Sequence, residues 1–148
     1  MNEEVKPRVN VTVEVADSKT GQVLETQETH NLVVDAGLNL IRDALQFGVV
    51  SPITRIGLGT SGTAVSASDT ALLGEIAKYT LLSITPSNKT LICQYFLDGS
   101  TANGQTIREL GLFTNDGTMY ARVLLDIPIP KTDLKVASMT WTLDWGAV

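Results

Sequence analysis

Few side chains in this sequence have the types and spacing that chemistry requires. The chain has one histidine, His30, and one cysteine, Cys93. His30 has no nucleophile motif near it, and a hydrolytic triad requires a base, an orienting acid and a nucleophile. One histidine and one cysteine cannot supply the ligands of a zinc site within a single chain. Cys93 lies in an apolar run, so we expect a buried, unreactive thiol. For the reasons above we also expect that His30 has a structural role and that the chain binds no cofactor.

Carboxylate and amide side chains remain as candidates for calcium binding or acid–base chemistry. Asp98, Asn103, Asn115 and Asp116 lie in two polar loops, and these loops would form an oxygen-rich site if they converged. The sequence has no D-x-D-x-D-G pattern, and such residues are common in turns. The spacing of the carboxylates does not favour a paired-carboxylate glycosidase. We expect no enzyme and no metal site, although the sequence leaves open whether a loop binds calcium.

Glu109 is the most unusual charged residue because it lies in an apolar segment, residues 108–113. Arg55 and Arg122 lie on segments that are predicted to form neighbouring strands. An ion pair with either arginine would fix the register of the strands. We therefore name Glu109, Arg55 and Arg122 as candidates for a structural ion pair.

The glycines at 57, 59 and 62 match a G-x-G-x-x-G pattern. No helix is predicted to begin at the end of this stretch, and no strand–helix–strand unit surrounds it. A phosphate-binding loop requires both. We therefore interpret these glycines as points of close backbone approach within a strand.

Alternation of apolar and polar residues predicts strands through most of the chain. Turn-forming residues separate them, and the Asp-Gly pair at 116–117 is a strong hairpin signal. We also expect one helical turn within residues 69–76. The pattern predicts a single all-β domain, residues 1–148, folded as a two-sheet antiparallel sandwich that is jelly-roll-like. About eight strands are predicted, at residues 9–15, 22–29, 53–59, 78–84, 90–97, 106–113, 118–125 and 137–145.

One stretch has helical spacing instead, and it predicts a short α-helix at residues 35–47. Leu38, Ile41 and Leu45 recur on one face, and this face must pack on the sandwich because a helix of about three turns is not stable alone. Asp35 is suited to cap the first turn and Gly48 to end the helix in a left-handed conformation. Gly37 within the first turn indicates close backbone contact.

The first two predicted strands form a hairpin that is long for its weak apolar content. It is therefore compatible with an N-terminal arm, residues 1–30, that projects from the core and pairs with a neighbouring chain. In that arrangement the candidate interface residues are Val9, Val11, Val13, Val15 and Glu25.

Composition excludes several classes of partner. The net charge is −5 and the eleven basic residues are scattered, which argues against binding nucleic acid. No apolar run approaches the length of a membrane span, and the charged N-terminus lacks the apolar region of a signal peptide. We expect synthesis in the cytoplasm. Charged residues make up only 18% of the chain, which suits a surface that is partly covered in an assembly.

Several motifs, taken in order, resemble a group of small virion structural proteins of tailed bacteriophages and prophages, described as tail-fibre-like or tail-collar-like. They lie at residues 29–41, 53–60, 69–72, 109–113 and 141–143, so that the resemblance spans residues 9–145. The resemblance implies a non-enzymatic component of the virion that is made in the host bacterium. It also implies a homo-oligomer, a trimer by analogy, that contacts other virion proteins.

Three functions follow from these observations as alternatives. The first is a homo-oligomeric subunit of the tail, fibre or baseplate. The second is a capsid decoration protein whose residues 1–8 and first strand clamp the head. The third is a module that binds host glycans through Trp141, Trp145 and Tyr120, although their alternation with polar residues favours a core position. The sequence does not decide between tail and capsid, and it identifies neither the copy number nor a host receptor.

Overall fold

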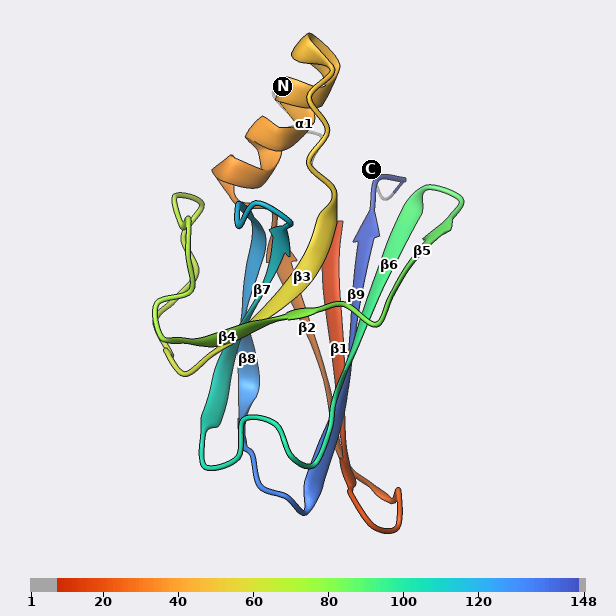
Figure 1. Cartoon of the computed structure of the whole chain (residues 1–148), viewed down its shortest axis with the longest axis vertical. Helices are drawn as coiled ribbons and strands as arrows, with labels where there is room; N and C mark the ends of the chain where they lie inside the picture. The colour runs from red at the N-terminus through yellow and green to blue at the C-terminus, as the bar shows by residue number, and fades with distance from the viewer. Residues whose placement is uncertain (1–7, 147–148) are drawn as a thin grey trace.

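The computed structural model describes residues 8–146, which contain nine β-strands and one α-helix (Figure 1). The elements follow the predicted segments closely, because most strands alternate between buried and exposed side chains. In chain order they are β1 (Arg8–Asp17), β2 (Val23–Leu32), α1 (Asp35–Phe47), β3 (Ile53–Gly59), β4 (Glu75–Thr80), β5 (Ser83–Ser87), β6 (Thr90–Leu97), β7 (Thr106–Thr114), β8 (Met119–Pro130) and β9 (Lys135–Asp144).

The strands form two antiparallel sheets, which confirms the predicted all-β sandwich with one short helix. The larger sheet has the order β2-β1-β9-β6-β5 and the smaller one the order β4-β3-β7-β8. The core lies between them and includes Trp141 of β9, Leu110 of β7 and Val123 of β8, all with no exposed surface. The apolar C-terminal strand β9 is in the middle of the larger sheet, as its composition predicts.

The strand predicted at residues 78–84 is divided between the two sheets, which gives nine strands instead of eight. The backbone N–H of Leu81 donates to Thr54 O in β3, at 3.0 Å. The next N–H, that of Leu82, donates to Gln94 O in β6, at 2.8 Å. The chain therefore crosses from one sheet to the other within a single peptide unit and joins β4 to β5.

The N-terminal hairpin does not project from the sandwich as an arm, so this prediction is wrong. β1 lies between β2 and β9 in the larger sheet. The candidate interface valines face the core and are at most 4% exposed, so they are unavailable to a partner chain: Val9, Val11, Val13 and Val15. Glu25 is partly exposed on β2, opposite Val15. Residues 1–7 of the predicted arm lie outside the described residues.

The outer edge of β2 is covered by β8 of the other sheet, and Gln27 connects the two edges. Its side-chain Nε2 donates to Ile127 O at 2.8 Å, and its Oε1 accepts from Ile127 N at 3.0 Å. The backbone N–H and C=O of Ile127 would make the same two hydrogen bonds with a neighbouring strand. The Thr29 hydroxyl adds a longer bond to Leu124 O, 3.4 Å away. Side-chain hydrogen bonds therefore hold β2 against β8 along this stretch.

Helix α1 has the predicted bounds, but it is capped differently. Val34, not Asp35, is the N-cap residue, and no side chain caps the helix; Asp35 is its first residue. Gly48 ends the helix in a left-handed conformation, as predicted, with a φ of 67°. A Cβ atom on Gly37 would lie 2.3 Å from Tyr120 O, which explains the glycine where the helix meets β8.

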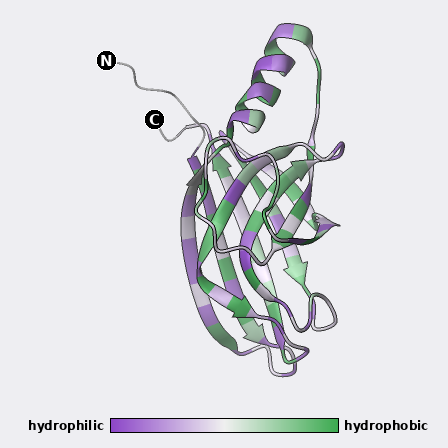
Figure 2. Cartoon of the chain, turned by 90° about the vertical axis from the view of Figure 1, so that its left-hand side faces the viewer, coloured by the Kyte–Doolittle hydropathy of each residue, from purple (hydrophilic) through white to green (hydrophobic). Residues whose placement is uncertain are grey.

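Only the first half of α1 packs on the sandwich. Leu38 and Ile41 contact the core, whereas Leu45, predicted to do the same, is 85% exposed. The reason is geometric, because the helix leaves the end of the sheets and extends beyond them (Figures 1 and 2). Within residues 8–146, no helix has the length and apolar character to cross a membrane.

The Gln27 contact leads to a prediction about stability. Replacing Gln27 with Ala removes both partners of the Ile127 peptide groups, and we expect the free energy of unfolding to fall by about 1 to 3 kcal/mol. Urea denaturation followed by circular dichroism would measure this change. Gln22→Ala is the matched control, because Gln22 is exposed in the adjoining turn, and it should change stability by less than about 0.5 kcal/mol. Equal stability of the two variants would contradict the assigned role of Gln27.

Candidate functional site

The carboxylate of Glu109 is fully buried and is held by four hydrogen bonds. Its Oε2 accepts from the backbone N–H groups of Ser61 and Gly74, at 2.8 and 2.9 Å. Its Oε1 accepts from Leu73 N at 2.9 Å and from Arg122 Nε at 3.1 Å. Three of the four donors belong to the loop at residues 60–74, so the carboxylate holds both ends of this loop against β7.

The guanidinium of Arg122, on the adjacent strand β8, holds the middle of the same loop and has no exposed surface. Nη2 donates to Thr63 O at 2.8 Å. Nη1 donates to Ala64 O at 3.4 Å and to the Asp69 carboxylate at 3.1 Å. Arg122 therefore lies between two carboxylates, those of Glu109 and Asp69, and the positive charge is paired on both sides.

Of the two arginines named for Glu109, the structure places Arg122 against it and Arg55 elsewhere. Arg55 is exposed on β3, where its backbone register places it opposite Phe113. Gly59, not Arg55, is the β3 residue opposite Glu109. Asp69, the third member of the cluster, was not predicted, because the turn-forming residues around it indicated a helical turn. Residues 69–74 form turns and irregular loop instead, with Leu72 buried and Leu73 exposed.

The glycines of this region are required by packing and not by a phosphate. A Cβ on Gly59 would lie 2.6 Å from Cγ of Glu109, and a Cβ on Gly74 would lie 2.7 Å from the Thr60 hydroxyl oxygen. Gly57 and Gly111 leave room for the Phe113 ring, which packs with Leu72 in a small second core under the loop. Two glycines of the G-x-G-x-x-G match, Gly57 and Gly59, therefore leave the space in which the loop packs on the smaller sheet.

The cluster of Glu109, Arg122 and Asp69 is suited to structure and not to catalysis. Glu109 and Arg122 have no contact with solvent, and the oxygens of Glu109 are engaged by backbone and guanidinium donors. A buried ion pair contributes to stability only when such additional hydrogen bonds compensate for desolvation. We therefore interpret the cluster as the clamp that fixes the 60–74 loop.

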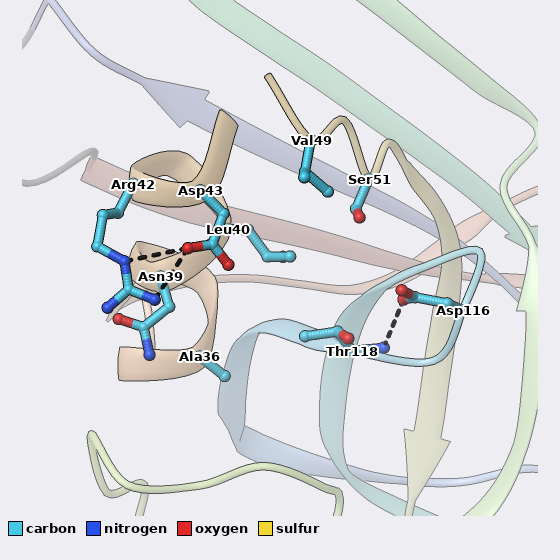
Figure 3. A pocket seen from close by; sticks show the side chains of 9 residues that line it. All are labelled: Ala36, Asn39, Leu40, Arg42, Asp43, Val49, Ser51, Asp116 and Thr118. Atoms are coloured by element: carbon cyan, nitrogen blue, oxygen red, sulfur yellow. Dashed lines mark hydrogen bonds and ion pairs between the residues drawn. The ribbon is translucent and has the colours of Figure 1, made fainter. Parts of the chain in front are cut away.

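The two loops considered for calcium lie at opposite ends of the sandwich and do not converge. Asp116 is next to α1, where it lines a pocket with Asn39 (Figure 3). Asn103 lies at the other end, and its Oδ1 accepts from the buried ammonium group of Lys131 at 2.9 Å. The Thr101 and Ser100 hydroxyls bind Asp98 and lower its pKa. Residues 8–146 contain no group of three or more His, Cys, Asp or Glu side chains that could hold a metal ion.

The pocket beside α1 is open, is lined by both polar and apolar residues and has a volume of about 400 Å³. Figure 3 shows the two carboxylates that line it. Asp43 accepts from the guanidinium of Arg42, on its own helix, at 2.9 Å. Asp116 accepts from the Thr114 hydroxyl, and this bond lowers the pKa of Asp116. Each carboxylate therefore already accepts a hydrogen bond from a neighbouring residue of the same chain.

The other candidate residues are separated in the structure. His30 is exposed on β2, with Nε2 3.8 Å from the carboxylate of Glu28. Of the aromatic side chains considered for glycan binding, Trp141 and Tyr120 are buried in the core, whereas Trp145 is 42% exposed. They therefore do not form a common surface, and the expected core position holds for two of the three.

Comparison with known proteins identified no relative of this chain. No family model, no curated protein and no solved structure matches the chain.

The clamp leads to a prediction for Glu109. In Glu109→Gln the side-chain amide presents N–H groups to backbone N–H donors, and Arg122 loses one of its two carboxylate partners. We expect the free energy of unfolding to fall by about 3 to 5 kcal/mol in urea denaturation. The matched control is Glu14→Gln on the exposed face of β1, which should be nearly neutral. Unchanged stability of the Glu109 variant would contradict the clamp.

The core thiol leads to a prediction about pH. Burial raises the pKa of the Cys93 thiol to about 11, from an ordinary value of 9.0. The unfolded chain therefore ionises first, and stability that is present below pH 9 is lost as the pH rises toward about 11. At neutral pH we expect a thiol reagent to label Cys93 only after unfolding. Cys93→Ala should remove this part of the alkaline loss, and fast labelling of the folded chain would contradict the burial.

Proposed function

We propose that this chain is a non-enzymatic structural subunit of a tailed-phage virion. In this proposal it is made in the cytoplasm of the host bacterium and assembles with copies of itself in the tail, fibre or baseplate. The resemblance of residues 9–145 to tail-fibre-like and tail-collar-like proteins supplies the context. The structural support is an apolar surface at one end of the sandwich, which a subunit of an assembly would cover.

This apolar end consists of Leu45 and Phe47 of α1 and Val49 and Val50 of the following segment. Leu45 and Val50 are the two most exposed large apolar side chains among residues 8–146. All four side chains are more than half exposed, and a cluster of exposed apolar side chains is a common feature of interaction sites. The exposed apolar end is the single observation that favours assembly most.

The form of the sandwich indicates how such a subunit would associate. Gln27 connects the β2 and β8 edges along one long side. Along the other long side, the chain crosses directly from β4 to β5 at Leu81 and Leu82. Strand exchange through the N-terminal hairpin is therefore disfavoured, and contacts between side chains at the end of the molecule are favoured.

The two alternative functions receive less support. The clamp proposed for capsid decoration uses residues 1–8 and the β1 strand. Residues 1–7 lie outside the described residues, and Val9 is buried within the sheet. The glycan-binding alternative requires a platform of exposed aromatic side chains, and of the three candidates Trp141, Trp145 and Tyr120 only Trp145 is exposed. No specific observation favours either function over self-assembly.

The first test of the proposal is the mass of the chain in solution. We expect native mass spectrometry and sedimentation at micromolar and higher concentrations to show a defined multiple of the 15.9 kDa chain, because association covers the apolar end. A monomer at every concentration would contradict self-assembly.

The location in the particle is tested separately, by immunogold labelling of phage particles produced by cells that express the protein. Label on tails supports the proposal. Label on heads would replace it with the decoration alternative, and absence of label from particles would contradict a virion role.

A further inference from the structure

An apolar groove of about 410 Å³ lies next to the exposed apolar end. One wall is the underside of α1, with Leu40, Ile41 and Ala44, and the opposite wall includes Ile84 of β5 and Leu91 of β6. None of the described residues that line it is charged. Ala44 contributes to this shape, because its short side chain leaves the groove open beside the helix.

The aromatic side chain of Phe47 protrudes from the same end of the molecule. Phe47 is the last residue of α1, lies one turn beyond Ala44 and is 66% exposed. One surface of the chain therefore carries both a protruding aromatic group and an apolar recess. A surface of this kind is self-complementary, because the protruding group of each copy can enter the recess of another.

We propose that Phe47 of one copy occupies the groove between α1 and β5–β6 of a second copy. This inference rests on the proposed self-assembly and identifies the surface that makes it. Leu45, Val49 and Val50 of the first copy then cover the rim of the groove. A reciprocal exchange gives a dimer, and a cyclic exchange closes a ring such as a trimer.

Charge favours this end as the contact between copies. The chain carries a net charge of −5, so two copies repel each other over most of their surfaces. The groove is uncharged, and the nearby charges of Arg42 and Asp43 neutralise each other at 2.9 Å. The contact therefore brings apolar surfaces together without burying an unpaired charge.

The size of the surface agrees with a specific contact. A stable interface covers about 800 Å² on each partner. The four side chains of the apolar end and the groove supply the apolar centre of such an interface, and Leu82 and Ile84, 72% and 41% exposed, extend it toward the sheet.

The first experiment removes the protruding group. Phe47→Ser should raise the dissociation constant of the oligomer about 30-fold or more, the effect of losing a hot-spot residue, in sedimentation equilibrium. Leu134→Ser is the matched control, because Leu134 is 51% exposed at the opposite end of the sandwich. Both variants change exposed positions, so thermal melts should show that each remains folded.

The second experiment maps the contact with disulfides. Chains carrying Phe47→Cys are mixed with chains carrying Ile84→Cys under mild oxidation, and the native Cys93 is buried and does not interfere. We expect a disulfide-linked dimer between the two kinds of chain. Leu134→Cys in place of Ile84→Cys should give no such product.

The outcomes separate this inference from the proposed function. An oligomer that persists in Phe47→Ser, or that forms 47–47 links without 47–84 links, would overturn the inference and leave self-assembly standing. A wild-type chain that is monomeric at every concentration would overturn both.

Discussion

The architecture depends on one buried carboxylate. Glu109 accepts three backbone N–H groups of the 60–74 loop and the Nε–H of Arg122. The loop, the longest irregular segment between two strands, would otherwise leave its peptide groups unpaired over an apolar sheet. Because the carboxylate is fully buried, each of these bonds forms without competition from water. Seating the loop covers Phe113 and Leu72, so one polar contact creates the second apolar core of the molecule.

The same clamp explains why several sequence features occur together. Gly59 and Gly74 leave the space that the carboxylate and the Thr60 hydroxyl occupy, and Asp69 balances the far side of the Arg122 guanidinium. These residues are far apart in sequence, yet they serve one contact. The motifs at residues 53–60, 69–72 and 109–113 are therefore parts of one structural unit.

Local periodicity was sufficient to predict the sheets, a β1 strand with one buried face and the bounds of α1, because these follow from alternation and from apolar spacing. It was not sufficient for features decided by tertiary contacts. Periodicity shows that one face of β1 is buried, but not whether the same chain or a partner covers it; the smaller sheet of the same chain covers it. Leu45 has helical spacing but lies beyond the end of the sheets. Glu109 stood out as a buried charge, whereas its backbone donors carry no signal in the side-chain sequence.

The two long sides of the sandwich differ in what holds them together. On one side a continuous peptide passes from β4 to β5. On the other side β2 is joined to β8 by the amide of Gln27 and the hydroxyl of Thr29, and just beyond β2 by backbone pairing of Val33 with Ala121. A covalent connection cannot separate under thermal fluctuation, whereas side-chain hydrogen bonds break and re-form readily. Because hydrogen bonds alone hold β2 to β8, we expect local opening of the sandwich to begin on that side.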